Sequence, residues 1–308
     1  MKTNTWTLLG ASTDVRSVEW PTLLLLLGCY AIWALATIWI SALSLPLAIA
    51  VVTVMIALHS SLSHEALHGH PFKSDGLNEA LIFPCIGLFI PYRRFRDLHL
   101  AHHRDSILTD PYDDPESNYL DPKVWHKLPR VAQWVLRFNN TLAGRLVVGP
   151  IVSMWVLVKT DYIAIRAGDK SIAQAWLMHI PAVSIVLLWL SFTPMPLWAY
   201  LISVYCGFSI LKIRTFLEHQ AHEAADGRTV VIEDRGPLAL IFLNNNLHAV
   251  HHKHPKVAWY MLPKLWNDNR ERFLERNGGY YYASYRQIFA RHFLRGKDPV
   301  AHPLWSKK

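Results

Sequence analysis

Two long stretches of the chain contain no Asp, Glu, Lys or Arg. One runs from Trp20 to His64 and the other from Ser171 to Leu211, and each is longer than forty residues. Because a helix needs about 20 apolar residues to cross a bilayer, each stretch is long enough for two crossings. Prolines interrupt both stretches near their middles, at Pro46 and at Pro194 and Pro196. We therefore expect two helical hairpins, with membrane-spanning helices at about 21–42, 45–66, 173–192 and 197–217.

The composition agrees with a membrane protein. Of the 308 residues, 52% are hydrophobic and 13 are Trp, a residue that is enriched at membrane interfaces. The net charge of +8 could indicate nucleic-acid binding, but the basic residues flank the apolar segments instead of forming a basic domain. No nucleic-acid partner is therefore expected. Cys29, Cys85 and Cys206 stand in apolar surroundings without a CxxC pair, which disfavours disulfides and thiolate metal sites.

These features predict an all-α integral membrane protein that forms one domain over residues 1–308. Residues 67–172 and 218–308 would lie outside the membrane. They contain two apolar pieces, Ala80–Tyr92 and Leu146–Val158, that are short for a crossing. The first predicts an interfacial or re-entrant helix. The second predicts a helix on the membrane surface, although a slanted crossing is an alternative.

Helix length predicts on which side the polar parts meet. At a rise of about 1.5 Å per residue, His64 lies roughly 27 Å from Pro46, and His219 lies roughly 35 Å from Pro196. Each distance is about one bilayer core or more, so the second helix of each hairpin ends on the same face. That face carries most of the Lys and Arg, and the positive-inside rule makes it cytoplasmic, together with both termini. We expect the inner membrane of a bacterium.

Three histidine boxes follow apolar runs. They read His64-Glu65-Ala66-Leu67-His68, His99-Leu100-Ala101-His102-His103 and His248-Ala249-Val250-His251-His252. On a helix, positions i, i+3 and i+4 share one face, so each box directs its imidazoles to one side. Convergent imidazoles are metal ligands. Boxes that meet on one membrane face therefore predict a metal centre.

The histidines are too many for one tetrahedral site. His219, near the end of the fourth predicted span, is the ninth candidate. Two metals with four or five nitrogen ligands each would use the whole set, and adjacent histidines can reach different metals. Redox iron accepts nitrogen ligands, whereas Mg²⁺ or Ca²⁺ would call for carboxylates. The candidate ligands are His64, His68, His99, His102, His103, His219, His248, His251 and His252.

The three boxes resemble those of the membrane fatty acid desaturase and hydroxylase superfamily, which carries HxxxH, HxxHH and a third HxxHH around four transmembrane helices. The resemblance covers roughly residues 20–260. It extends to His219, since members carry a further ligand histidine near the end of the fourth helix. It implies a non-haem centre of two iron ions, which uses O2 and two external electrons to oxidise an unactivated C–H bond.

The resemblance also implies the partners. A site beside the spans can receive a lipid acyl chain directly from the bilayer. The chain has no cytochrome-like haem motif and no CxxxxCxxC pattern, so electrons are expected from a separate donor of the ferredoxin or cytochrome b5 type. Basic residues beside the second box are candidate docking charges for this donor: Arg93, Arg94, Arg96 and Arg104.

The boxes leave the product of the reaction open. Desaturation removes a second hydrogen, whereas hydroxylation adds oxygen, and the same histidine ligands serve both. Asn246-Leu247-His248 with Pro255 resembles both bacterial acyl-lipid desaturases and carotenoid ketolases. We expect a fatty acid desaturase that introduces a C=C bond, with a lipid hydroxylase or a carotenoid ketolase or hydroxylase as the alternative.

Two other classes are consistent with parts of the pattern. The first box is a literal HExxH, the signature of zinc proteases, in which the glutamate activates water. A bis-histidine haem protein is the other alternative, but haem ligands are single facing histidines. Neither class uses all three boxes. Glu65 is then expected to orient an imidazole through its ring N–H instead of acting as a catalytic base.

Overall fold

The computed structural model describes residues 18–305, and four of its helices are long and apolar enough to cross a membrane. The first span, Trp20–Leu43, consists of α1 (Trp20–Leu35), a π-helical turn (Ala36–Ile40) and α2 (Ser41–Leu43). The other spans are α3 (Leu45–Leu67), α10 (Lys170–Ser191) and α11 (Leu197–Thr215). The sequence prediction of four spans is confirmed, with each end within three residues of its expected position.

Short breaks separate the helices of each hairpin. Ser44 has an extended backbone (φ −154°, ψ 101°) between α2 and α3, and Pro46 lies in the first turn of α3. Pro196 immediately precedes α11. Proline is tolerated at these positions because the first backbone N–H groups of a helix have no intrahelical acceptor.

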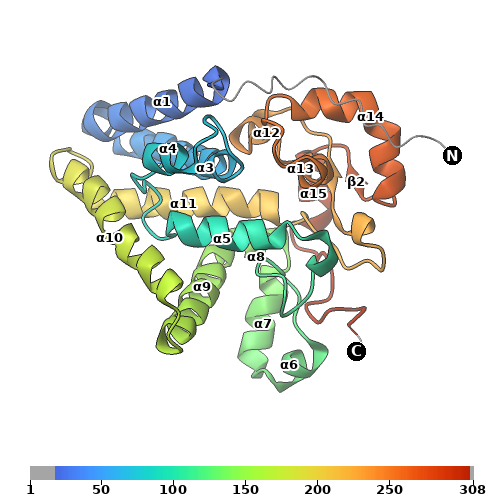
Figure 1. Cartoon of the computed structure of the whole chain (residues 1–308). Coiled ribbons are helices and arrows are strands. Elements are labelled where there is room, and N and C mark those ends of the chain that lie inside the picture. The colour runs from blue at the N-terminus through green and yellow to red at the C-terminus, as the bar shows by residue number, and fades with distance from the viewer. Residues whose placement is uncertain (1–17, 306–308) are drawn as a thin grey trace.

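The helices α3 and α11 form the inner pair of the four spans. In the most apolar stretch of each span, 56% of α3 and 44% of α11 are buried, against 28% of the first span and 22% of α10. Figure 1 shows α3 and α11 between α1 and α10. Gly207 of α11 permits this close packing, since a Cβ there would come within 2.8 Å of Ile56 on α3. This close packing fixes the position of the box-bearing end of α3 along the length of α11.

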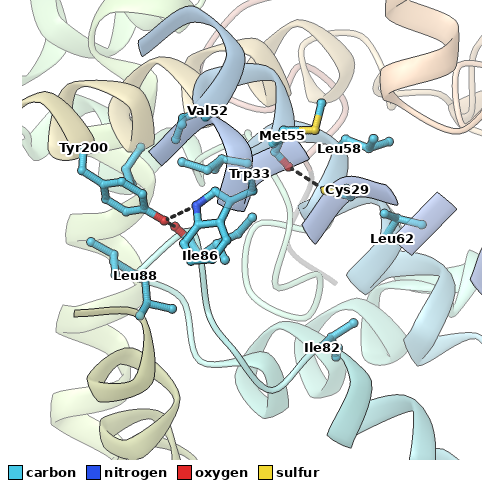
Figure 2. Close-up of a cluster of buried hydrophobic side chains, with 14 of the residues drawn as sticks. Cys29, Trp33, Val52, Met55, Leu58, Leu62, Ile82, Ile86, Leu88 and Tyr200 are labelled. Atoms are coloured by element: carbon cyan, nitrogen blue, oxygen red, sulfur yellow. Dashed lines mark hydrogen bonds between the residues drawn. The ribbon is translucent and has the colours of Figure 1, made fainter. Parts of the chain in front are cut away.

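Aromatic side chains tie the first span to α11 across the core. The Trp33 indole N–H donates to the Tyr200 hydroxyl at 3.1 Å, and this hydroxyl donates to the Ile86 carbonyl at 2.7 Å (Figure 2). Ile86 belongs to the segment between α4 (Asp75–Leu81) and α5 (Tyr92–His102). The connection between the first two boxes is thus anchored on the spans.

The expectation of an interfacial or re-entrant helix over Ala80–Tyr92 is wrong. Residues 82–91 form irregular turns, with a positive φ of 62° at Leu88. Pro84 and Pro91 remove backbone donors that a helix would need. Groups on the spans form hydrogen bonds with part of this backbone instead. The Cys85 N–H donates to the Ala182 carbonyl at 3.3 Å, and the His179 ring N–H donates to the Leu88 carbonyl at 2.8 Å.

The second short apolar piece forms two helices. α8 (Leu142–Val147) and α9 (Gly149–Arg166) are separated at Val148, directly before Gly149 and Pro150, and α9 is not among the four candidate spans. Before them lie α6 (Pro122–Lys127) and α7 (Arg130–Asn139). Figure 1 shows α7 and α9 running across the direction of α11.

The remaining chain packs at the end of α3 and α11 that carries the boxes (Figure 1). Its helices are α12 (Pro237–Ile241), α13 (His248–Lys253), α14 (Leu262–Arg276) and α15 (Tyr285–His292). Two short parallel strands, β1 (Val231–Ile232) and β2 (Tyr281–Tyr282), join them. Single 3-10 turns lie at Asp105–Ile107 and Ala225–Arg228. The prediction that both termini are cytoplasmic concerns residues 1–17 and 306–308, which lie outside the described residues.

Candidate metal centre

The nine candidate histidines come together beside the ends of α3 and α11. The first box closes α3, the second closes α5, the third opens α13, and His219 follows α11. Their ring nitrogens form two groups, and within each group the nitrogens lie within 4.8 Å of one another. The five-histidine group consists of His64, His68, His99, His103 and His251, and the four-histidine group of His102, His219, His248 and His252.

Helical spacing explains how the second and third boxes divide. The i, i+4 pair His99 and His103 belongs to the five-histidine group, whereas His102 points into the other. The third box has the reverse arrangement, because its i, i+4 pair belongs to the four-histidine group and His251 to the five-histidine group. Adjacent residues on a helix differ by about 100° in direction. Each vicinal pair can therefore supply both groups.

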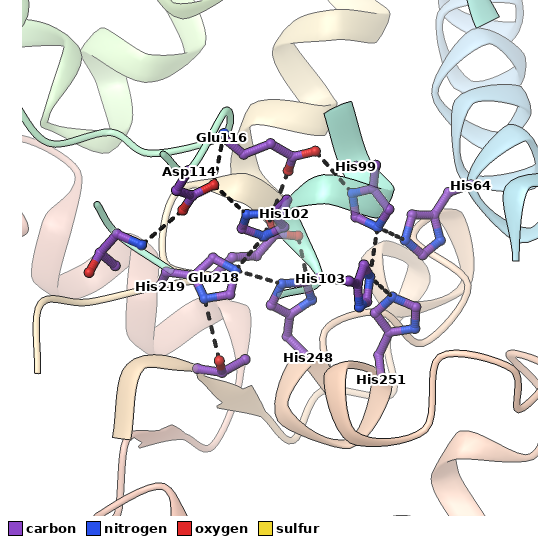
Figure 3. A network of polar contacts seen from close by, with 12 residues as sticks. His64, His99, His102, His103, Asp114, Glu116, Glu218, His219, His248 and His251 are labelled. Atoms are coloured by element: carbon purple, nitrogen blue, oxygen red, sulfur yellow. Dashed lines mark hydrogen bonds and ion pairs between the residues drawn. The ribbon is translucent and has the colours of Figure 1, made fainter. Parts of the chain in front are cut away.

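Four Nε2 atoms of the five-histidine group, those of His64, His99, His103 and His251, converge (Figure 3). That of His99 lies 3.0 Å from His64 Nε2 and 2.9 Å from His103 Nε2, and His103 Nε2 lies 3.1 Å from His251 Nε2. Two nitrogens about 2.1 Å from a common ion and at right angles to each other lie about 3.0 Å apart. His68 Nε2 is buried without a hydrogen-bond partner among the described residues. A metal ion would satisfy all of these nitrogens at once.

The four-histidine group has the same geometry. His219 Nε2 lies 2.9 Å from His102 Nε2 and 3.1 Å from His248 Nε2 (Figure 3). His219 is positioned by an isolated antiparallel bridge to Thr229 and by the Lys297 ammonium, which donates to its carbonyl. The residues of both groups thus fit metal ions with nitrogen ligands.

Two carboxylates hold the outer nitrogens of the second box. Asp114 Oδ1 lies 2.7 Å from His102 Nδ1, and Glu116 Oε1 lies 3.0 Å from His99 Nδ1. Asp114 also accepts the backbone N–H of Thr109 and Glu116, at 2.8 and 2.9 Å. A carboxylate that accepts Nδ1–H leaves the Nε2 lone pair for a metal. One short loop thus orients one imidazole in each group.

Neutral acceptors lie at the outer nitrogens of two further histidines of the four-histidine group. Asn245 Oδ1 lies 2.9 Å from His248 Nδ1, and Thr229 Oγ1 lies 3.4 Å from His219 Nδ1. Sequence reasoning missed both of these residues, as well as Asp114 and Glu116. The acidic run Asp110–Glu116 indicated a loop, but no spacing rule connects it with a box on a neighbouring helix.

The electrostatics of the site favour uncharged imidazoles. Burial lowers the pKa of His68 and His103 well below its ordinary value, and neighbouring imidazoles such as His99 add to this effect. The charged form costs desolvation energy in such surroundings, so these rings keep a free lone pair. Burial likewise lowers the pKa of the following residues: His219, His248, His251 and His252.

His102 is the exception among these imidazoles. Burial opposes its charged form, but the carboxylates of Glu116 and Asp114 outweigh burial and raise its pKa to about 9. Carboxylates that stabilise a proton on this ring also stabilise a metal cation at Nε2. The negative charge of the loop therefore lies next to the four-histidine group.

Glu65 lies on the outer side of the His64 ring. Its Oε2 accepts the Trp259 backbone N–H at 3.1 Å, and its Oε1 is 3.7 Å from His64 Nδ1. His64 Nε2, on the other side of the ring, faces His99. A zinc protease needs its glutamate next to metal-bound water, and this geometry disfavours that class.

The candidate docking arginines do not all remain on the surface. Arg94 is buried and makes a bidentate ion pair with Asp161, with both N–O distances 2.8 Å. It therefore cannot contact a donor protein, and that expectation is wrong. Arg93 and Arg96 are partly exposed and face Glu79, and Arg104 is exposed.

Four apolar spans with two histidine groups at one end define a helical membrane protein with two candidate metal sites. A model of the fatty acid desaturase family matches residues 37–285. The chain therefore belongs to the fatty acid desaturase family, which confirms the resemblance of its boxes. A beta-carotene ketolase from Paracoccus sp. (strain N81106 / MBIC 01143) is 25% identical over 215 residues, which are 66% of this chain and 71% of the ketolase. Both findings support an oxidoreductase.

Proposed function

We propose that this protein is an O2-dependent di-iron oxidoreductase that introduces a C=C bond into lipid acyl chains. The observation that carries the proposal is the division of nine imidazoles into groups of five and four, each with ring nitrogens within 4.8 Å of one another and several Nε2 pairs about 3 Å apart. An all-nitrogen donor set suits redox iron better than the hard ions that prefer oxygen ligands. The two irons, when bound, would supply the activation of O2, which is reduced to water with two electrons from the external donor and two from the C–H bonds of the substrate.

The residues of the chain have distinct roles in this proposal. Both histidine groups would hold iron through Nε2, and acceptors at Nδ1 fix the tautomer and direction of four of the rings, those of His99, His102, His219 and His248. Asp114 and Glu116 orient His102 and His99 in this way. Glu65 is proposed to support His64 from behind, at 3.7 Å.

The position of the centre supports a lipid substrate. The first box lies within and directly after α3, a candidate membrane span. An acyl chain can therefore reach the site from the bilayer without crossing water. We place the centre and both termini on the cytoplasmic side, where a ferredoxin or cytochrome b5 type protein can supply electrons, and propose a bacterial inner membrane. Arg93, Arg96 and Arg104 are candidate contacts for this donor.

A carotenoid ketolase or hydroxylase is the second candidate function. The similarity to the beta-carotene ketolase favours it. The two functions share the oxidant and the ligands, and they differ in which apolar molecule reaches the irons.

The test is expression of the full chain in a host that lacks both activities, supplied with its electron-transfer proteins. Mass spectrometry of total lipids and carotenoids is expected to show acyl chains that have lost two hydrogens. His103→Ala and His251→Ala are the inactive controls. A product that has gained oxygen would replace the desaturase by the second candidate, and purified protein without bound iron would overturn the di-iron proposal.

A further inference from the structure

The helix α7 exposes an apolar face that no other described element covers. Val131 is 76% exposed, Trp134 74%, Phe138 43% and Val135 40%. These four positions lie at i, i+3, i+4 and i+7 and therefore form one stripe along the helix. A stripe of this kind, which includes an indole, needs an apolar environment.

The polar edge of α7 is basic. Arg130 and Arg137 are both exposed and lie about two turns apart beside the apolar stripe. From Pro122 to Thr160 the chain contains no Asp or Glu but six basic residues, namely Lys123, Lys127, Arg130, Arg137, Arg145 and Lys159. An apolar stripe bordered by arginines is typical of helices that lie in a lipid headgroup region.

The neighbours of α7 place it at the level of a membrane surface. It packs on α8, and the Arg145 guanidinium of α8 lies 5.9 Å from the Phe216 ring, directly after the α11 span. At the start of α9, Ser153 accepts a hydrogen bond from Lys212 in the last turns of α11 at 2.6 Å. α7 runs across the direction of α11 (Figure 1). It is therefore close to the end of a span and roughly in the plane of the membrane.

We propose that α7 lies in the headgroup region of an anionic bilayer, with Trp134 and Val131 at the acyl boundary and Arg130 and Arg137 next to lipid phosphates. The absence of acidic residues from this part of the sequence favours anionic over neutral lipid, because each basic residue near such a surface strengthens binding about fivefold. A second copy of the chain would bring the same positive charges together. This proposal does not depend on the reaction that the metal centre catalyses.

The test uses the full chain in phosphatidylcholine vesicles, with and without phosphatidylglycerol. The three native cysteines are replaced by alanine, and a nitroxide label is attached at Trp134→Cys or, on the same stripe, at Val131→Cys. Lys127→Cys, at the exposed C-terminal end of α6, is the control. We expect labels on the stripe to be accessible to O2 but protected from a water-soluble nickel chelate, whereas the control shows the reverse.

Phosphatidylglycerol is expected to increase this protection, and Arg130→Gln/Arg137→Gln is expected to abolish the increase. Lys264→Gln/Arg235→Gln, which removes two exposed basic residues near α14, is expected to keep it. Equal nickel access at Trp134→Cys and Lys127→Cys would overturn the proposal. So would dipolar broadening between labels of two copies, since another protein chain would then cover the stripe. Protection that does not change with phosphatidylglycerol would overturn the assignment to anionic lipid.

Discussion

The Asp114 carboxylate lies 2.7 Å from Nδ1 of His102, and both side chains are 1% exposed. The contact joins a loop after the second box to the four-histidine group. It determines which nitrogen of His102 carries the proton, and therefore leaves Nε2 for the metal.

Asp114→Asn is expected to weaken metal binding at the four-histidine group by about 10- to 100-fold, the usual cost of losing such a partner. Iron titration of the purified apoprotein, followed by Mössbauer spectroscopy, measures occupancy of the two groups. Asp113→Asn is the matched control, because Asp113 is exposed in the same loop and donates its backbone N–H to Asp110. Equal weakening by both variants would show that Asp114 acts only through the fold of the loop.

Glu116→Gln is expected to weaken chiefly the five-histidine group, since Glu116 Oε1 is 3.0 Å from His99 Nδ1. Its other oxygen is 3.9 Å from His102 Nε2, so a smaller effect on the second group is expected. The same iron titration separates the two variants. An occupancy pattern identical with that of Asp114→Asn would contradict the assignment of one carboxylate to each group.

His251→Ala and His252→Ala are expected to release iron from different groups, although the two residues are adjacent. His251 belongs to the five-histidine group and His252 to the four-histidine group. Each variant is expected to retain the metal of the other group and to lose activity. Metal analysis together with the Mössbauer spectrum of the remaining iron is the measurement, and loss of the same iron in both variants is the contrary result.

Arg94→Gln is expected to destabilise the protein by about 3–5 kcal/mol, because it leaves the Asp161 carboxylate buried without its partner. The two side chains are 9% and 1% exposed, and the Trp176 indole also donates to Asp161, at 2.9 Å. Arg93→Gln is the control: its pair with Glu79 is 32% and 20% exposed and is worth at most about 1 kcal/mol. Thermal unfolding in detergent compares the variants. Similar midpoints would show that the buried pair does not hold α5 against α9.

Glu65→Gln is expected to retain both metals, because the amide oxygen can still accept the Trp259 N–H. Neither this variant nor the parent protein is expected to cleave an added protein. Glu65→Ala removes that acceptor and is expected to lower iron affinity at the five-histidine group. Proteolysis by the parent protein that is abolished by Glu65→Gln would restore the zinc protease hypothesis.

The sequence alone determined the spans and the candidate ligands. Uncharged runs longer than forty residues must be buried or lie in lipid, and the prolines at their middles mark the turns, so the helix boundaries could be predicted to within three residues. Histidines at helical spacing identify the boxes because helical geometry is local. The same local reasoning was wrong for Ala80–Tyr92, where a backbone carbonyl, an imidazole and a hydroxyl of the spans hydrogen-bond to irregular backbone.

Only the tertiary structure decided how nine histidines divide between two groups and which side chains orient them. Asp114 and Glu116 contact imidazoles 12 and 17 residues away. Asn245 contacts His248, and Thr229 contacts His219. Arg94, a surface charge by sequence, is buried because α9 brings Asp161 against it. Such contacts depend on the packing of separate elements, and a linear sequence encodes that packing only through the sum of many weak, long-range interactions.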